Sequence, residues 1–292
     1  MKNEIVDLFD GEDAVREIDV FSMFRNNASY LPFFTETTRE MERMYPSTRF
    51  VYHIAENDSH DGTRAELRRF AEGRPGRVRL QLDPPLEEEY VNKPSGKNYT
   101  RLRVLSKLRN RLVARARPIG SKWCLFVESN IFFEPNVLRL LFERRPAQHN
   151  TGLLCPYTQQ LFMPEVHPFV KRTALLGHFY DTFSLFNKDN QSYWPQCGFA
   201  RCKFCTRTEY VDRTPIPEDP EGLTEVGCAF GGLALIRGDV LNDPTCVWTT
   251  FNHNMRDDEG TCEHVAFCHA LRTNHALKVH VAQGVDRVYR TI

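Results

Sequence analysis

The polar triplet Glu128-Ser129-Asn130 places an acid, a hydroxyl and an amide directly after the apolar run Trp123–Val127. A short continuous apolar run is typical of a strand covered on both faces by helices in a mostly parallel sheet. Ligands of such sheets bind at the carboxyl ends of the strands, so the triplet is well placed to hold one. The alternative is an ordinary turn, in which Ser129 and Asn130 bond local backbone groups.

A second polar segment follows the strand that β-branched and aromatic residues predict at 50–55. It contains Glu56, Asn57, Asp58 and Asp61, and a predicted helix at 64–72 begins just beyond it. A strand, an acidic turn and a helix in this order form the repeating unit of a nucleotide-binding α/β fold.

Basic residues gather between positions 101 and 117. They are Arg101, Arg103, Lys107, Arg109, Arg111, Arg115 and Arg117. Such a group can bind one or two phosphates, and the alternative is a solvated helix face. A leucine stripe at helical spacing (Leu102, Leu105, Leu108 and Leu112) predicts a helix over 99–116 whose apolar side is core.

These segments are positioned by a regular alternation of predicted elements. Strands are predicted at 18–24, 50–55, 78–82, 123–127, 153–156 and 276–281, and helices at 35–45, 64–72, 99–116, 136–143 and 262–271. A proline-rich surface loop is predicted at 84–96. Regularity is lost from 157 to about 224, as in a lid or binding loop, and returns with a glycine-rich turn that leads into an apolar strand within 226–236.

Composition excludes some classes of protein. Lys plus Arg and Asp plus Glu are equal at 38 each, so no global field recruits nucleic acid or an anionic membrane. No run of ~18 apolar residues and no secretory signal is seen, and we therefore expect a cytoplasmic protein without a membrane span.

The nine cysteines favour a reduced protein in which several thiols pack as small hydrophobic groups. Cys197, Cys202 and Cys205 form a C-x4-C-x2-C pattern near His178 that could hold zinc. Structural zinc sites normally show two ligand pairs, so a reduced or disulfide-linked loop is favoured over zinc.

Six blocks in a fixed order resemble glycosyltransferase family 69, the fungal capsule-type α-mannosyltransferases. The blocks are FVYHIAENDSHDGT, RLRVLSKLRN, CLFVESNIFFEP, HFYDTF, CAFGGLALI and CEHVAFCHALRTNHALKVHVAQGV, and they span about residues 50 to 285. The resemblance implies a single-domain α/β fold of the GT-A-like (Rossmann-like) type, with a mixed, mostly parallel sheet flanked by helices. It further implies a nucleotide-sugar-binding half at 15–150 and an acceptor-binding half at 151–292. The missing membrane anchor departs from the family's Golgi-resident members and suggests a soluble outlier, such as one encoded by a large virus.

The resemblance also implies roles for particular residues. The donor would be bound by Glu56, Asn57, Asp58, Asp61, Arg101, Lys107, Arg109, Glu128, Ser129 and Asn130, and the glycan acceptor by Tyr180, Asp181, Gly231 and Gly232. Glu128 and Asn130 stand where the family carries an aspartate-containing motif, so weak binding of a divalent cation (Mn or Mg) is expected there. Catalytic acids are expected at Glu263, Asp257 and Asp258, although a solvated turn or a helix cap explains the two aspartates equally well.

The sequence therefore predicts a glycosyltransferase that uses a nucleotide-sugar donor, with GDP-mannose or a UDP-sugar such as UDP-xylose as alternatives. A protein of the same fold that binds a nucleotide or a sugar without catalysis is the main rival. A zinc-stabilised interaction module built on the cysteine-rich segment is the third.

Overall fold

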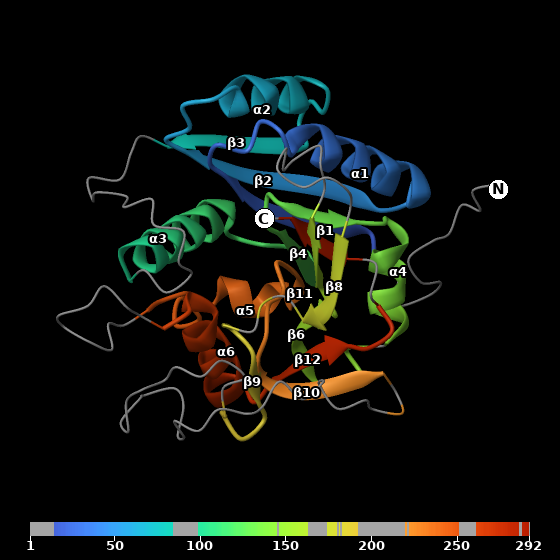
Figure 1. Cartoon of the computed structure of the whole chain (residues 1–292), viewed down its shortest axis with the longest axis vertical. Helices are drawn as coiled ribbons and strands as arrows, with labels where there is room; N and C mark the ends of the chain where they lie inside the picture. Colours follow the sequence, from blue (N-terminus) through green and yellow to red (C-terminus); the bar gives the residue numbers. More distant parts are fainter. Residues whose placement is uncertain are drawn as a thin grey trace.

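A mixed, mostly parallel sheet organises the chain, as Figure 1 shows. The structure is a computed structural model that describes residues 15–83, 99–144, 146–162, 174–179, 181, 183–191, 220, 222–250, 261–285 and 288–291. Within these residues the main sheet has nine strands in the order β3-β2-β1-β4-β11-β6-β12-β10-β9. Strand β1 runs parallel to both β2 and β4, β2 parallel to β3, and β6 parallel to β12, whereas β11 is antiparallel to β4 and β6.

The strands of this sheet are β1 (Glu17–Phe24), β2 (Arg49–Asn57), β3 (Val78–Asp83), β4 (Trp123–Val127), β6 (Thr151–Pro156), β9 (Phe186–Asn187), β10 (Leu223–Cys228), β11 (Leu233–Arg237) and β12 (Lys278–Ala282). A smaller sheet joins β5 (Ile131–Phe133), β13 (Val288–Thr291), β7 (Gln159–Phe162) and β8 (Ala174–Phe179) in the order β5-β13-β7-β8. The helices are α1 (Leu31–Met44), α2 (Thr63–Glu72), α3 (Tyr99–Ala116), α4 (Asn136–Glu143), α5 (Gly238–Asn242) and α6 (Glu263–Asn274).

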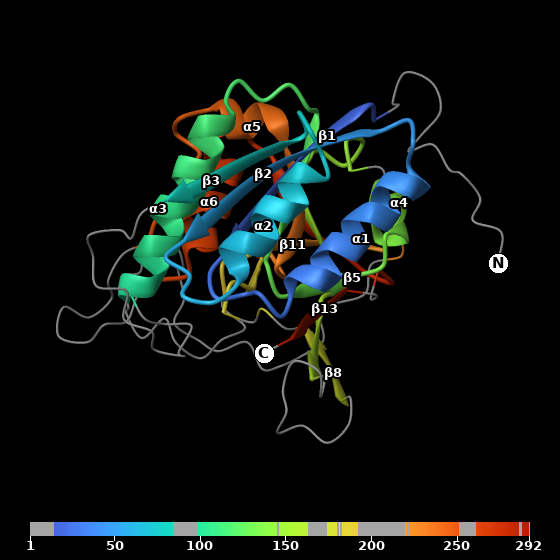
Figure 2. The same ribbon diagram turned by 90° about the horizontal axis from the view of Figure 1, so that it is seen from above.

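Two apolar layers cover the faces of the main sheet. Ile18, Val20 and Phe24 of β1 pack in one layer with the apolar sides of α1, α2 and α4. Phe21 faces the opposite way, in a layer with α3, α5 and α6. Figure 1 shows α3, α5 and α6 on one side and α4 on the other, and Figure 2 shows α1 and α2 side by side over β1 to β3. Alternate strand residues point to opposite faces, so β1 contributes to both layers.

Most elements predicted from local patterns are present. The helix at 99–116 and the strand at 123–127 have the predicted bounds, and every residue of β4 is buried. Helix α1, however, begins at Leu31, with a proline in its first turn, rather than at Thr35. Proline lacks an N–H and is accepted in a first turn, where an N–H needs no helical partner.

The expectation of lost regularity over 157–224 was wrong in part. Strands β7, β8 and β9 lie within that span, and β10 begins at its end. These short strands depend on partners distant in the chain: β13, for example, pairs with both β5 and β7. Helix α5 and strand β13 were not predicted at all.

Cysteines of the described residues are free and buried, as expected of reduced thiols in apolar surroundings: Cys124, Cys155, Cys228, Cys246, Cys262 and Cys268. The trio Cys197, Cys202 and Cys205 lies outside the described residues, as does the predicted loop at 84–96. Within the parts of the chain that the structure describes, no helix has the length and apolar character needed to cross a bilayer.

Candidate active site

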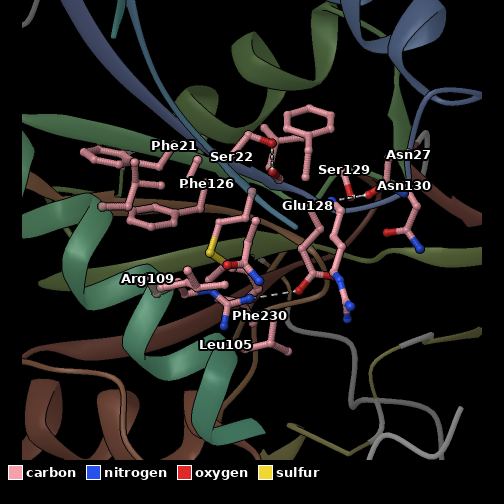
Figure 3. Close-up of a pocket in the computed structure, with 18 of the residues that line it drawn as sticks. Phe21, Ser22, Asn27, Leu105, Arg109, Phe126, Glu128, Ser129, Asn130 and Phe230 are labelled. Carbon is pink, nitrogen blue, oxygen red and sulfur yellow. Dashed lines mark hydrogen bonds and ion pairs between the residues drawn. The ribbon is translucent and has the colours of Figure 1, made fainter. Parts of the chain in front are cut away.

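A cavity of about 220 Å³ opens at the carboxyl ends of β1, β2 and β4, beside α3 (Figure 3). Six of the predicted donor-binding residues line it: Asn57, Arg101, Arg109, Glu128, Ser129 and Asn130. Carboxyl ends of parallel strands meet at one edge of a sheet, which is why segments distant in the sequence converge here.

Hydrogen bonds between strand ends and loops fix this edge of the sheet. Ser22 of β1 donates its hydroxyl to the carbonyl of Val127 at 2.7 Å. Ser129 donates to Oδ1 of Asn27 at 2.9 Å, and the backbone N–H of Asn27 donates to Oγ1 of Thr63 at 2.8 Å. Ser129 thus lines the cavity and bonds a side chain 102 positions away, rather than a local backbone group as in an ordinary turn.

Asn57 is the last residue of β2, is 4% exposed and lines the cavity. Its Oδ1 atom is buried and has no hydrogen-bond partner within the described residues. Because buried polar atoms are nearly always paired, a lone acceptor in a cavity wall indicates a ligand that brings an N–H group.

The acidic turn after β2 is used to build the turn itself. Glu56 is fully buried; its carboxylate accepts the backbone N–H of Ser59 at 2.6 Å and forms an ion pair with Arg64. Asp61 accepts from the backbone N–H groups of Ala28 at 3.1 Å and Thr63 at 3.0 Å. The Thr63 hydroxyl also donates to Asp61 at 2.5 Å, and this bond together with the two backbone bonds outweighs the effect of burial and lowers the pKa of Asp61.

The remaining predicted donor-binding residues also lie off the cavity wall. Asp58 pairs at 3.5 Å with Arg25, a lining residue that follows β1. Lys107 is exposed on α3 and does not line the cavity. The structure therefore gives no direct role in the cavity to Glu56, Asp58, Asp61 or Lys107.

Arg109 joins two acidic residues at the inner end of the cavity. It is 3% exposed, forms an ion pair with Glu263 and lies 3.1 Å from Oε1 of Glu128. Glu263 is itself 3% exposed, whereas the Glu128 side chain is 28% exposed. Glu263, predicted to be catalytic, is therefore placed to hold Arg109 and, through it, to orient Glu128.

An aromatic residue supports this ion-pair network. The Arg109 guanidinium lies 5.4 Å from the ring centroid of Phe230, and the ring of His264 stacks on Phe230 with centroids 3.7 Å apart. Burial, and next the charge of Arg109, lower the pKa of His264 well below its ordinary value. The neutral ring accepts the indole N–H of Trp248 at Nδ1, at 3.2 Å.

Asp181 is a third acid of this region. Burial, together with the charges of Glu128 and Glu263, raises the pKa of Asp181 to about 7, against hydrogen bonds from Ser184 and the backbone N–H of Gly231. A carboxyl group with a pKa near neutrality can exchange a proton with a substrate at physiological pH.

The two predicted acceptor-binding glycines form the tight turn between β10 and β11. Gly231 and Gly232 have φ values of +64° and +73°, a backbone region that disfavours other residues. A Cβ atom on Gly232 would lie 2.5 Å from Cδ1 of Ile131 and 3.4 Å from Oε2 of Glu128. Gly232 therefore allows the turn to approach Glu128.

Three predicted site residues, Tyr180, Asp257 and Asp258, lie outside the described residues. Lining residues that sequence reasoning missed include Arg25, Asn27 and Phe230. Arg25 and Asn27 follow the carboxyl end of β1, so the rule that selected Glu128 after β4 could have found them. Phe230 carries no comparable signal, because its contact with Arg109 depends on the tertiary fold.

No protein-family model matches the sequence, and no curated protein matches it. Among solved structures the chain is similar to S. aureus TarS 1-349 in complex with UDP-GlcNAc, with a TM-score of 0.50 and 13% identity, covering 95% of this chain and 58% of that one. It is also similar to the mannosyltransferase PcManGT from Pyrobaculum calidifontis in complex with GDP-Man and Mn²⁺, with a TM-score of 0.49 and 13% identity, covering 99% of this chain and 59% of that one. The chain thus spans less than two thirds of either structure. At this identity the likeness concerns the fold alone, which is the single-domain GT-A-like arrangement of a mixed, mostly parallel sheet flanked by helices.

Proposed function

We propose that this chain is a glycosyltransferase that transfers a sugar from a nucleotide-sugar donor to a glycan acceptor. The observation that carries the proposal is the cavity at the carboxyl ends of β1, β2 and β4, where an orphaned Asn57 amide oxygen and a set of charged groups line one space. Ligands of open α/β sheets bind at this position. The UDP-GlcNAc and GDP-Man held by the two similar structures support a donor of this class.

In this proposal the base lies near Asn57 and Ala55, where the amide oxygen accepts an N–H of the base. Both uracil and guanine carry such a donor, so GDP-mannose and a UDP-sugar such as UDP-xylose remain the two donors to compare. The diphosphate lies toward Arg25 and Arg101, whose charges would neutralise the leaving group.

Glu128 and Asn130 fit a divalent cation. Both line the cavity, and each offers the oxygen ligands that Mg²⁺ and Mn²⁺ prefer. The Arg109 ion pair involves Oε1 of Glu128, and the side chain is partly exposed. When bound, the ion would neutralise charge on the diphosphate.

Proton transfer is assigned to Asp181. An acceptor hydroxyl attacks the anomeric carbon, the bond from that carbon to the diphosphate oxygen breaks, and the hydroxyl proton passes to the Asp181 carboxylate. Asp181 is preferred to Glu263 because the Glu263 carboxylate is buried in its ion pair with Arg109. Glu263 then acts as a positioning residue, and catalytic roles for Asp257 and Asp258 stay predictions.

The test is a calorimetric titration with UDP- and GDP-sugars, each with and without Mn²⁺, followed by an assay of donor hydrolysis without acceptor. A donor at one hundred times its Kd should stabilise the protein by ~2.7 kcal/mol. Arg101→Ala should weaken donor binding, whereas Lys107→Ala, a matched control on the exposed part of α3, should not. Absence of binding by every nucleotide sugar would refute the proposal.

A binding protein without catalysis is the second candidate function. The observation in its favour is that Arg109 already neutralises Glu128, the only acid among the residues that line the described cavity. Such a protein would bind the donor with the same response to Arg101→Ala and yet hydrolyse none of it.

A further inference from the structure

A second group of chemically reactive side chains lies away from the cavity, between the segment after α5 and the end of α6. Asp243 follows α5, Cys246 lies in the turn after it, and His275 follows α6. One ligand atom from each residue lies within 4.8 Å of the others. The proposed transferase activity uses none of the three.

The arrangement of His275 and Asp243 is unusual for a simple ion pair. Nε2 of His275 and Oδ2 of Asp243 are 2.9 Å apart. Nε2 is nevertheless shielded from solvent and makes no well-directed hydrogen bond within the described residues. Two polar atoms at this separation that do not point at each other can instead point at a common centre.

The ligand types and distances fit zinc. Zinc binds sulfur, nitrogen and oxygen at about 2.0 to 2.3 Å, which places tetrahedral ligand atoms roughly 3.3 to 3.6 Å apart. The observed separations, from 2.9 Å to at most 4.8 Å, bracket these values. A side-chain movement of about 1 Å would therefore bring the three atoms to zinc geometry.

The carboxylate of Asp243 is already oriented. Its Oδ1 atom accepts the backbone N–H of Thr245 at 2.7 Å and the Thr245 hydroxyl at 2.8 Å, which directs Oδ2 toward His275. Arg117 donates to the carbonyl of Asp243 at 3.1 Å and holds the backbone of the turn. Hydrogen bonds to the ligand residues orient those residues around a metal ion and are a regular feature of metal sites.

The solvent exposure of the three side chains is also suitable for a metal site. Cys246 is 2% exposed, whereas the side chains of Asp243 and His275 are 27% and 25% exposed. The thiol is thus protected, while an ion and one water molecule can reach the open side. Asn274 donates to Oγ1 of Thr245 at 3.4 Å, so the two segments already meet.

We infer that Asp243, Cys246 and His275 form a zinc site, with a water molecule as the fourth ligand. The ion would join the turn after α5 to the end of α6. Trp248 follows the turn closely and stacks on Phe267 of α6 with ring centroids 4.1 Å apart, so the site would hold both segments beneath Phe126 and the cavity.

The test uses the full chain, stripped of metal with a chelator and titrated with Co²⁺ and then with Zn²⁺. Wild-type protein should show thiolate-to-cobalt charge-transfer absorption that one equivalent of zinc abolishes. Cys246→Ser and His275→Ala should each lose one equivalent of bound metal. Thr245→Val, which removes the hydroxyl contacts to Asp243 and Asn274 but none of the three ligands, should weaken zinc binding by about 10- to 100-fold.

A combined variant in which Cys197, Cys202 and Cys205 are all changed to Ser is the matched control, because that segment also contains potential zinc ligands. It should keep the equivalent that Cys246→Ser loses. Circular dichroism of the metal-free variants establishes that each is folded, and His275→Ala alters a partly exposed side chain. An unchanged number of bound equivalents in both Cys246→Ser and His275→Ala, or no metal binding by the wild type, would overturn the inference.

Discussion

Replacing Arg109 by methionine should be among the most damaging single changes near the site. Methionine keeps much of the length of the side chain but removes the positive charge between Glu263 and Glu128. Glu263 is 3% exposed, so its charge would remain buried without its partner. Breaking a buried ion pair in this way typically costs about 3 to 5 kcal/mol.

The contributions of the two acids differ. The Glu128 side chain is 28% exposed, so water can solvate its charge, and the loss of this contact should add less than about 1 kcal/mol. Almost all of the destabilisation should therefore come from Glu263. The double variant Arg109→Met with Glu263→Gln removes both buried charges and should recover much of the lost stability, because a buried pair contributes little net free energy relative to neutral groups.

The assay is urea denaturation of the wild type, both single variants and the double variant, which together form a double-mutant cycle. Arg43→Met is the matched control, because Arg43 forms an exposed ion pair with Glu40 at 3.1 Å on α1. It should change the free energy of unfolding by about 0.5 kcal/mol or less. If Arg109→Met cost no more than Arg43→Met, the claim that the Glu263 charge depends on Arg109 would be wrong.

Three further predictions concern residues in and around the site. Asp181→Asn should lower turnover by about 10²- to 10⁴-fold, and wild-type kcat/KM should rise as pH increases through about 7, where the Asp181 carboxyl loses its proton. Because this folded-state pKa is raised above the ordinary value of 3.8, the native state binds more protons between these values, so wild-type stability should fall as pH rises through this window, and less steeply in Asp181→Asn. Asn57→Ala should weaken donor binding by about 1 to 3 kcal/mol in calorimetry, and unchanged binding would remove Asn57 from the site. Gly232→Ala should destabilise the protein more in urea denaturation than Gly76→Ala, because both have positive φ but only a Cβ on Gly232 meets a neighbour within 4 Å; equal losses would contradict the steric argument.

Local patterns predicted the elements that carry the site. The leucine stripe of α3 and the apolar run of β4 are complete within one segment, so their bounds could be predicted from the sequence. Strand β13 could not, because its four residues form a strand only by pairing with β5 and β7. The leucine spacing also did not predict the direction of every side chain. Leu105 belongs to the stripe that was predicted to be core, and it lines the cavity.

Glu56 and Asn57 illustrate what the sequence leaves open. Both were predicted to bind the donor from one turn, yet they are neighbours at the end of β2, and neighbouring strand residues point to opposite faces. Glu56 bonds Ser59 and Arg64, whereas Asn57 lines the cavity. The predicted strand ended at residue 55, so the alternation that separates the side chains of Glu56 and Asn57 was not part of the prediction.

Contacts across the chain also bear on the two halves predicted at 15–150 and 151–292. Arg109 of α3 pairs with Glu263 of α6, which is 154 positions later, and Phe230 completes the wall of a cavity built mostly by the first half. Strand β11 of the second half lies directly against β4. The charge of Arg109 would therefore lose its buried partner, and the cavity one wall, if the halves were separated. In the proposed function, donor binding would therefore depend on residues of both halves.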